Sequence, residues 1–403
     1  MVRSGAVKFL IFILLFGTFV FGKYVGGFIS WFLFYSLLTL YLYIWVVSRF
    51  SLRSVMVIRN FSKPRLTAGD NIDIELVIWN RFEFPHSFIL VEDDKPSKLQ
   101  SAIVKQKNVV YPWFRPKSFI NYTAFQAVRG IHRWQSVELV SGDIFGLVQV
   151  KKKIPLVSEV VVFPKIRHIQ KWSSRNERNL GLAFSQNRIS EDASSVIGVR
   201  EYRRGDTFNR IHWKQSAKTM QLMTKEFERF ITNDFMFIVN QEVKAYENLD
   251  QLSFEVAIEL AASLVNYVAE QHFSIGIISE GATRKVSSLS RGQDHVVRIL
   301  EILASAEPET TIPYPETIKS ELPHLALGTT VVLITPSIDD SLFNLLIDLT
   351  ARRIKVEVFF IHQSASTLDN QRAGYLQESG VKLHYISINE WQSINEAGGL
   401  RID

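Results

Sequence analysis

The chain has 403 residues, of which 47% are hydrophobic and 21% charged, and its formal net charge is +6 at pH 7. This length predicts two or three domains, each able to bury a core. The chain has no cysteine, which excludes disulfides, thiolate nucleophiles and cysteine metal sites. The mild basic excess fits a surface facing anionic membrane lipid. We predict no nucleic-acid partner, because no recognisable nucleic-acid-binding fold accompanies the basic residues.

Two uncharged hydrophobic stretches, residues 9–22 and 24–47, are separated by Lys23. The second exceeds the roughly 20 residues needed to cross a bilayer. The first reaches that length if the Lys8 side chain extends to the membrane surface. We therefore predict a transmembrane helical hairpin over residues 1–50. A cleaved signal peptide over residues 1–22 is the alternative, although no small-x-small cleavage site ends it.

Basic residues flank this hairpin on both sides. Arg3 and Lys8 precede the first stretch, and Arg49, Arg53 and Arg59 follow the second. The positive-inside rule then places both ends of the hairpin in the cytoplasm. We predict a two-span protein of the cell membrane, with both termini and the soluble domains in the cytoplasm.

The region 51–162 contains short runs of β-branched and aromatic residues separated by turn residues. Such regular short strands predict an antiparallel β-sandwich. A basic run at residues 151–153 fits a solvated strand end or a membrane-facing patch. The strands are expected at residues 55–58, 72–79, 87–91, 109–113, 119–127, 130–139 and 146–150.

Residues 163–232 are polar and basic and predict a connector between two domains. Within it, residues 173–182 have the composition of a loop, and residues 190–195 are expected to begin a short helix.

The region 233–403 alternates strands with helices of about 10–20 residues, which predicts a parallel, doubly wound α/β sheet. Strands are expected at residues 235–240, 273–279, 329–334, 356–361 and 381–386. Helices are expected at residues 252–271, 294–304, 341–352 and 368–378.

The densest pattern lies at residues 198–228, where six basic side chains crowd the first 21 positions (Arg200, Arg203, Arg204, Arg210, Lys214 and Lys218). So many cations need acidic counterparts, either in the protein or on a ligand. Gly205 permits a turn, and Asp206 is expected to cap a helix over residues 207–218. Ile211 and Trp213 are expected to bury part of that segment.

This stretch resembles the signature of the domain-of-unknown-function 58 (DUF58) family. The matching positions are Gly198, Arg200, Tyr202, Gly205, Asp206, Arg210, Ile211, Trp213, Ser216, Ala217 and Lys218. The Asp-Ile-Phe-Gly-Leu run at residues 143–147 resembles the Asp-Pro-Phe-Gly-Leu element of that family, with Ile144 where proline is usual. The Val-Phe-Pro run at residues 162–164 resembles its Val-Tyr-Pro element.

The resemblance implies a von Willebrand factor A-like C-terminal domain and no established activity. Genes of the family commonly lie beside those of MoxR-type AAA+ ATPases and transglutaminase-like membrane proteins. The expected function is therefore a membrane-anchored, non-enzymatic scaffold or adaptor in envelope-related assembly or maintenance, with these proteins as partners.

A working von Willebrand A domain binds a divalent cation through oxygen ligands in an Asp-x-Ser-x-Ser sequence. Asn240 stands where the aspartate is expected, and neither serine is present. After the strand at residues 329–334, Thr335 is followed by proline and Ser337, without the expected aspartate. We predict that the metal site is lost, and we expect no cofactor. Weak binding through Asn240, Glu242 and Thr335 is the alternative.

Three interpretations of residues 198–228 stay open. His212, Ser216 and Asp206 have the residue types of a hydrolase triad, but no Gly-x-Ser-x-Gly elbow supports one. An arginine-lined anion site would make the protein an enzyme or a ligand sensor. Alternatively, the arginines pair with acids such as Asp206, Glu226 and Glu228 and lock the connector to both domains. We expect the third, with no catalytic residues.

Overall fold

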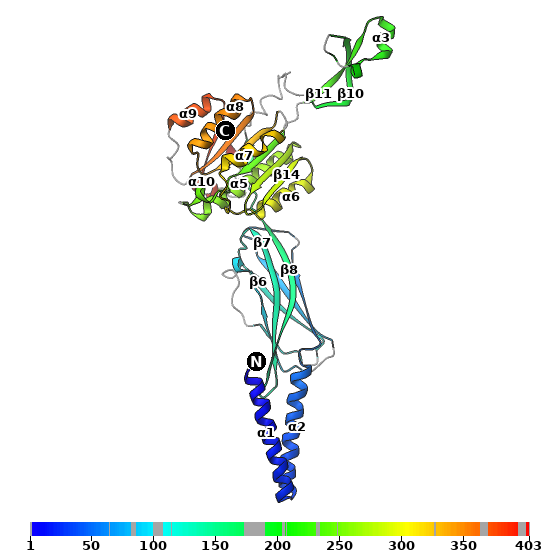
Figure 1. The fold of residues 1–403 in the computed structure, drawn as a ribbon, viewed down its shortest axis with the longest axis vertical. Coiled ribbons are helices and arrows are strands. Elements are labelled where there is room, and N and C mark those ends of the chain that lie inside the picture. The colour runs from blue at the N-terminus through cyan, green and yellow to red at the C-terminus, as the bar shows by residue number, and fades with distance from the viewer. Residues whose placement is uncertain are drawn as a thin grey trace. The chain divides into compact units, whose positions relative to one another are not determined.

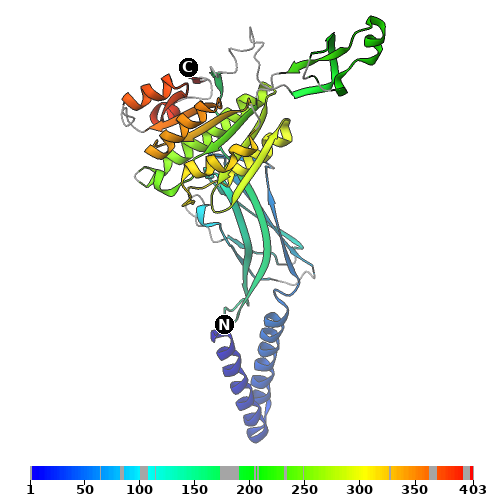
Figure 2. The ribbon, with the colours of Figure 1, turned by 45° about the horizontal axis from the view of Figure 1, so that its top comes forward.

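The computed structural model describes residues 2–63, 65–81, 86–99, 108–113, 115–172, 190–203, 206, 208–230, 234–247, 249–325, 328–362, 370–393 and 400–402. The chain divides into two compact units, Met1–Phe163 and Pro164–Asp403. Figures 1 and 2 show the elements of each unit.

The first unit begins with two long helices, α1 (Val2–Val25) and α2 (Phe28–Phe50). Gly26 and Gly27 join them with φ angles of 68° and 83°, a left-handed backbone that glycine adopts without strain. Both helices are long and apolar enough to cross a membrane, which suggests a membrane protein. The two predicted apolar helices are thus confirmed, while the side of the membrane stays a prediction.

A third helix, α5 (Gln251–Glu270), also contains an apolar stretch of spanning length at Leu252–Glu270. In α5, 67% of the most apolar stretch is buried inside the protein, whereas only 11% of the corresponding stretch is buried in α1 and in α2. Its apolar character therefore serves the core of the second unit.

After the hairpin, the first unit forms two β-sheets. Their side chains share one hydrophobic cluster, which includes Leu76, Ile120, Val91 and Trp134. The antiparallel strands agree with the expected β-rich region, and the sandwich arrangement stays a prediction. One sheet has the order β1-β3-β6, and its strands are Val55–Phe61, Ile72–Asn80 and Lys117–Ala124. The other has the order β2-β8-β7-β4-β5, with strands Leu66–Thr67, Gln149–Phe163, Gly130–Gly142, Ile89–Asp93 and Asn108–Val110.

Strand β8 is much longer than the expected strand at residues 146–150, and it includes the basic run 151–153. Lys152 donates hydrogen bonds from Nζ to the carbonyl oxygens of Leu52 (2.7 Å) and Arg53 (3.4 Å), just after α2. Lys151 pairs with Glu138 at 3.1 Å. Two of the three lysines are therefore held by the protein, one of them where α2 has ended.

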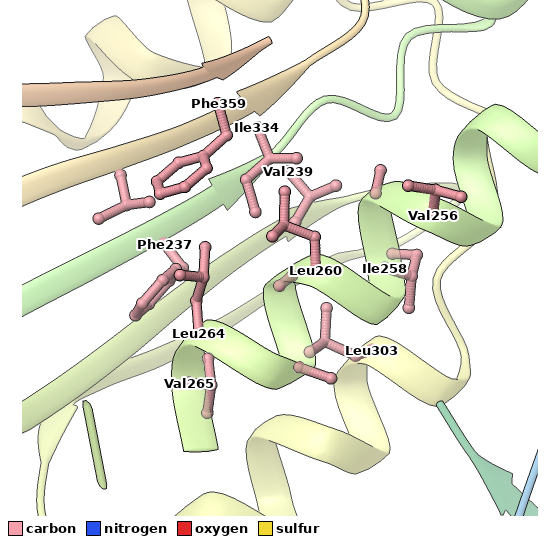
Figure 3. Close-up of a cluster of buried hydrophobic side chains, with 14 of the residues drawn as sticks. Phe237, Val239, Val256, Ile258, Leu260, Leu264, Val265, Leu303, Ile334 and Phe359 are labelled. Atoms are coloured by element: carbon pink, nitrogen blue, oxygen red, sulfur yellow. The ribbon is translucent and has the colours of Figure 1, made fainter. Parts of the chain in front are cut away.

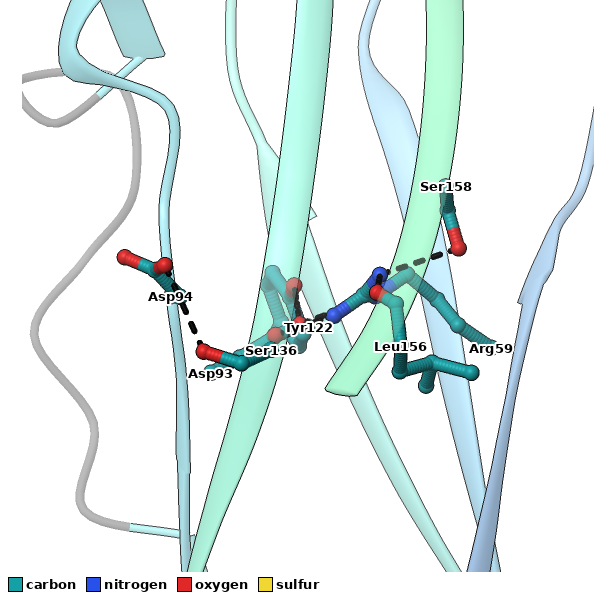
Figure 4. Close-up of polar contacts among 7 residues, drawn as sticks. All are labelled: Arg59, Asp93, Asp94, Tyr122, Ser136, Leu156 and Ser158. Carbon is teal, nitrogen blue, oxygen red and sulfur yellow. Dashed lines mark hydrogen bonds and ion pairs between the residues drawn. The ribbon is translucent and has the colours of Figure 1, made fainter. Parts of the chain in front are cut away.

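A buried ion pair lies inside the β-rich region (Figure 4). The Arg59 and Asp93 side chains approach to 2.5 Å and are 0% and 3% exposed. Arg59 Nη1 also donates to Ser158 Oγ and to the Leu156 carbonyl, each at 3.0 Å, and the Tyr122 hydroxyl donates to Asp93. Burial, together with the Asp93 carboxylate, raises the pKa of Tyr122 well above its usual range, so the hydroxyl stays a donor.

This pair removes Arg59 from the basic residues available to the membrane surface. Of the three arginines that follow the second apolar stretch, Arg49 and Arg53 are exposed and can face anionic lipid, whereas Arg59 is buried.

In the second unit, the central sheet has the order β14-β13-β12-β15-β16-β17. Five strands are parallel, namely β12 (Asp234–Val239), β13 (Ser274–Glu280), β15 (Thr330–Thr335), β16 (Lys355–His362) and β17 (Lys382–Ser387). They match the expected strands to within about two residues. The antiparallel edge strand β14 (Arg284–Ser290) was not expected.

Helices cover both faces of this sheet. Successive residues of β12 point to opposite faces, so Phe237 packs with α5 and α6 (Gln293–Ala304), and Ile238 packs on the other side. Figure 3 shows the first of these clusters, with Leu260 and Leu264 of α5 against Phe237. The other cluster contains residues of α7 (Tyr314–Glu321), α8 (Asp340–Ala351) and α9 (Asn370–Glu378).

Two carboxylates hold both ends of the second unit to this fold. Glu357 of β16 accepts from Trp172 Nε1 at 3.0 Å, at the end of β9 (Ile169–Trp172). Glu259 of α5 accepts from Arg167 Nε at 3.1 Å and from Trp391 Nε1 at 3.0 Å, on α10 (Ile388–Ser393). Segments near the beginning and near the end of this unit are thus hydrogen-bonded to α5 or β16.

We expect Arg59→Ala to lower the free energy of unfolding of the β-rich region by about 3–5 kcal/mol, because Asp93 would stay buried without its counter-charge. Amide hydrogen exchange of β3 and β6 in the full chain measures this loss. The control is Arg133→Ala, whose exposed ion pair with Glu159 should contribute at most about 1 kcal/mol. Equal effects of the two substitutions would contradict the prediction.

Candidate functional site

The 198–228 motif forms a two-stranded antiparallel ribbon with a helical connection (Figure 1). Strand β10 (Ser190–Glu201) pairs with β11 (Met223–Phe230), with Gly198 opposite Glu226. Between them lie a 3₁₀ turn, Phe208–Arg210, and the helix α3 (Trp213–Thr219). The short helix expected at residues 190–195 is wrong, because these residues belong to β10. The loop expected at residues 173–182 lies outside the described residues.

The Asp206 carboxylate is the centre of the motif. It accepts two parallel bonds from the Arg200 guanidinium, at 2.8 and 2.9 Å. It also accepts from the Arg203 backbone N–H at 2.9 Å and from Thr224 Oγ1 at 3.3 Å. The bonds from Arg200 and Arg203 hold the pKa of Asp206 well below its usual range. The carboxylate therefore joins both strands and the turn between them.

This geometry corrects the expected role of Asp206 as a helix cap. Its side chain closes the turn that begins at Arg203, and the residue that caps α3 is His212. The pairing expected between the arginines and Asp206 is present for Arg200. Gly205 lies outside the described residues, as do the side chains of Glu226 and Glu228.

His212 and Ser216 bind the backbone around α3. His212 Nδ1 accepts the Gln215 N–H at 3.1 Å, which caps the helix. Ser216 Oγ donates to the His212 carbonyl at 3.1 Å and accepts the Met223 N–H at 2.9 Å. These bonds attach α3 to β11. Both side chains thus have structural partners, and neither is positioned as a base beside a nucleophile.

The apolar residues of the motif divide into two groups. Ile211 is buried as expected, whereas Trp213 is 65% exposed, against our expectation. Phe208, Met220 and Leu222 are exposed as well. The Tyr202 and Phe208 rings stack with centroids 6.4 Å apart. We call residues 208–222 the motif tip.

Basic side chains accompany these exposed apolar ones. Lys214 and Lys218 of α3 are exposed, and so is Arg203 just before the tip. Arg210, at the end of the 3₁₀ turn, is half-buried. Sequence reasoning missed Phe208, Met220, Leu222 and Thr224. The sequence did contain a signal for them. Apolar residues alternate with lysines in this segment without the regular spacing of a buried helix or strand face.

The second candidate site lies where β12 and β15 end, at the residues where the family resemblance would place a cation and where we predict that the metal site is lost. Asn240 Nδ2 donates to Thr335 Oγ1 at 3.0 Å, while Asn240 Oδ1 accepts the Glu242 N–H at 2.9 Å. Thr335 Oγ1 donates in turn to the Ser337 carbonyl at 2.8 Å. Glu242 Oε2 accepts the Tyr314 N–H at 3.0 Å.

These residues do not fit a divalent cation. The bond from Glu242 fixes the Asn240 amide so that its NH₂ group, which cannot ligate a metal, faces Thr335. A cation binds oxygen donors aimed at one point, and here Asn240 Oδ1, Thr335 Oγ1 and Glu242 Oε2 each accept a hydrogen bond from the protein instead. Within the part of the chain that the structure describes, no group of three or more His, Asp or Glu side chains is arranged for a metal.

The lowered pKa of Asp206 gives the motif a defined acid dependence. A carboxylate with a depressed pKa contributes stability that is present above about pH 4 and is lost as the pH falls towards the lowered value. We expect amide protection in β11 to be constant near neutral pH and to fall in acid. Asp206→Asn should have lower protection at neutral pH and little further change in acid. An unchanged acid dependence in this variant would contradict the assignment.

We expect Asn240→Asp to lower the free energy of unfolding by about 1–3 kcal/mol, since it buries a charge and removes the bond donated to Thr335. Thermal unfolding with and without MgCl₂ measures this effect. The unsubstituted chain should show no magnesium-dependent shift. Calorimetric binding of magnesium in the micromolar range by the unsubstituted chain would overturn the interpretation of this site.

Comparison with solved structures gives only weak likenesses. A solved structure of proximal thread matrix protein 1 from the mussel byssus is 11% identical, covers 40% of this chain and 46% of its own, and gives a TM-score of 0.31. Cwp6 from Clostridium difficile is 12% identical over 82% of this chain and 49% of its own, with a TM-score of 0.14. Likenesses this low carry no argument about fold or function.

The sequence comparisons are more specific. The uncharacterized protein YeaD of Bacillus subtilis (strain 168) is 27% identical over 308 residues, which is 76% of each chain. Residues 198–362 match the family model of the protein of unknown function DUF58. This matched region begins at Gly198 and contains the Asp206 network, α3, β11 and most of the α/β sheet. Together the two findings support the resemblance of this chain to DUF58 over the matched region.

Proposed function

We propose that the protein is a membrane-anchored, non-enzymatic adaptor that binds a protein partner through the motif tip. The proposal rests on a contrast within the motif between polar side chains that are engaged and apolar side chains that are exposed. The side chains of Arg200, Asp206, His212 and Ser216 are engaged inside the protein, while four large apolar side chains are exposed (Phe208, Trp213, Met220 and Leu222). An active site would have the opposite arrangement, with polar groups converging on a pocket.

Four polar side chains of the motif have partners within it, namely Arg200, Asp206, His212 and Ser216. Each of these side chains makes at least one hydrogen bond within the motif. The Arg200 guanidinium in particular makes a bidentate pair with Asp206, so binding an anion there would require breaking that pair. This favours the adaptor over an anion sensor or enzyme.

The Trp213 side chain is exposed, as are Phe208 and Met220 in the same segment. Exposed apolar side chains that gather in one place mark interaction surfaces. Tryptophan is enriched among the residues that dominate binding energy at protein interfaces. The neighbouring Lys214 and Lys218 complement an acidic partner and would speed its association. The motif tip therefore fits a protein surface with an apolar pocket and an acidic rim.

The rest of the proposal concerns the setting of this interaction. We propose that the second unit has a von Willebrand factor A-like fold that has replaced its cation with the Asn240–Thr335 hydrogen bond, and that the β-rich region is a sandwich. We propose that both soluble parts face the cytoplasm. The family resemblance makes a MoxR-type AAA+ ATPase the first candidate partner and a transglutaminase-like membrane protein the second.

We expect Trp213→Ala to weaken binding to the MoxR-type ATPase by about 2 kcal/mol, or roughly 30-fold in Kd, because it removes a central aromatic contact. Lys214→Glu with Lys218→Glu should slow association and reduce its salt dependence. Surface plasmon resonance with the full chain in detergent measures both effects.

The matched control is Tyr375→Ala, which removes an exposed aromatic side chain of α9 in the same unit. This variant should bind normally. If Trp213→Ala binds as well as the unsubstituted chain, the motif tip is not the docking site.

A further inference from the structure

The turn at residues 143–147, which joins β7 to β8, is held in one conformation by Asp143. This side chain is buried, and its two oxygens accept the backbone N–H groups of Val148 (2.6 Å) and Phe145 (3.0 Å). The Gly146 N–H donates to the Asp143 carbonyl at 3.3 Å, and Gly146 has a φ angle of 70°. The turn is therefore a pre-formed feature of the β-rich region.

This turn presents two large apolar side chains to the outside. Ile144 is 66% exposed and Phe145 is 67% exposed. A turn of a soluble domain is usually polar, and a pair of adjacent exposed apolar side chains on a fixed turn indicates a contact surface.

The same turn lies against the helical hairpin. The Phe145 ring is 6.3 Å from the Tyr43 ring of α2, in an edge-to-face arrangement, and the Ile144 N–H donates to the Tyr43 hydroxyl at 3.4 Å. Behind the turn, Val148 forms a buried cluster with Ile11 of α1 and Ile44 of α2. Both apolar side chains are thus next to a helix that is apolar enough to span a membrane.

The depth of the turn follows from the polar residues around it. Lys8 of α1 donates a hydrogen bond to Ser48 of α2, which marks a polar level near the end of the hairpin. Tyr43 precedes Ser48 by five residues, which is about 7.5 Å along a helix. Phe145 therefore lies beside a part of α2 below that polar level, where Tyr and Trp rings meet the edge of the hydrocarbon.

We propose that the turn at residues 143–147 inserts Ile144 and Phe145 into the lipid interface beside α2. This inference rests on the proposed membrane anchoring of α1 and α2. The occupant of the surface is lipid, because the exposed side chains continue the apolar surface of the hairpin at Tyr43. The β-rich region then has a third contact with the bilayer, which fixes its tilt.

The chain has no cysteine, so single cysteines can be introduced and labelled without removing any native residue. Three full-length variants are labelled with the environment-sensitive fluorophore NBD and reconstituted in phosphatidylcholine–phosphatidylglycerol vesicles. Phe145→Cys tests the turn. Leu14→Cys reports on α1, and Val157→Cys reports on an exposed position of β8 eight residues beyond its start. Lipids carrying a nitroxide near the headgroup or near the chain end then quench each label according to its depth.

The expected result is a blue-shifted emission at position 145 that loses intensity with the shallow nitroxide. The label at position 14 should lose intensity with the deep nitroxide, and the label at position 157 should respond to neither. If position 145 behaves like position 157 while position 14 is quenched, the interfacial turn is wrong and the membrane anchor stands. If position 14 is not quenched, the anchor itself is wrong. A blue shift at position 145 without quenching would indicate a protein contact and would overturn the proposal of lipid.

Discussion

The bidentate bond between Arg200 and Asp206 decides what the motif can do. It neutralises one cation of an otherwise strongly basic segment and ties β10 to the turn that leads into α3. Thr224 adds a bond from β11 to the same carboxylate. Among the described side chains of the motif, the exposed ones include Phe208, Trp213, Met220 and the lysines Lys214 and Lys218. In this basic segment the Arg200 cation is thus paired within the protein, while the Trp213 side chain is exposed.

Both units use buried or partly buried carboxylates to hold segments of the chain together. Asp93 positions Arg59 between strands of the first unit, while Glu259 and Glu357 of the second hold the segments through which the chain enters and leaves. A buried ion pair such as Arg59–Asp93 contributes little net stability, but the loss of one partner is costly because the other is left buried and uncompensated. Such pairs favour one arrangement of strands over alternatives in which they would be unpaired.

The sequence predicted helices and strands best where burial imposes a regular pattern of apolar residues. The strands of the α/β sheet, such as β12 and β16, are continuous apolar runs, and α5 shows a clear helical period, so their limits were predicted to within about two residues. Strand β14 was missed because its Arg-Lys-Val-Ser-Ser-Leu-Ser sequence is an edge strand with little burial. Strand β10 was missed because its first residues are polar and its partner β11 is distant in sequence. The exposure of Trp213 depends on tertiary packing, which composition does not encode.

The long strand β8 also sets a distance. It runs from Gln149, next to the hairpin cluster, to Phe163, where the first unit ends. Its 15 residues span about 45 Å at the usual rise per residue of a strand. Paired along most of this length with β7, it acts as a stiff spacer rather than a flexible linker. The end of the first unit at Phe163 is therefore held at a set distance from the hairpin by a paired strand, whatever arrangement the second unit adopts.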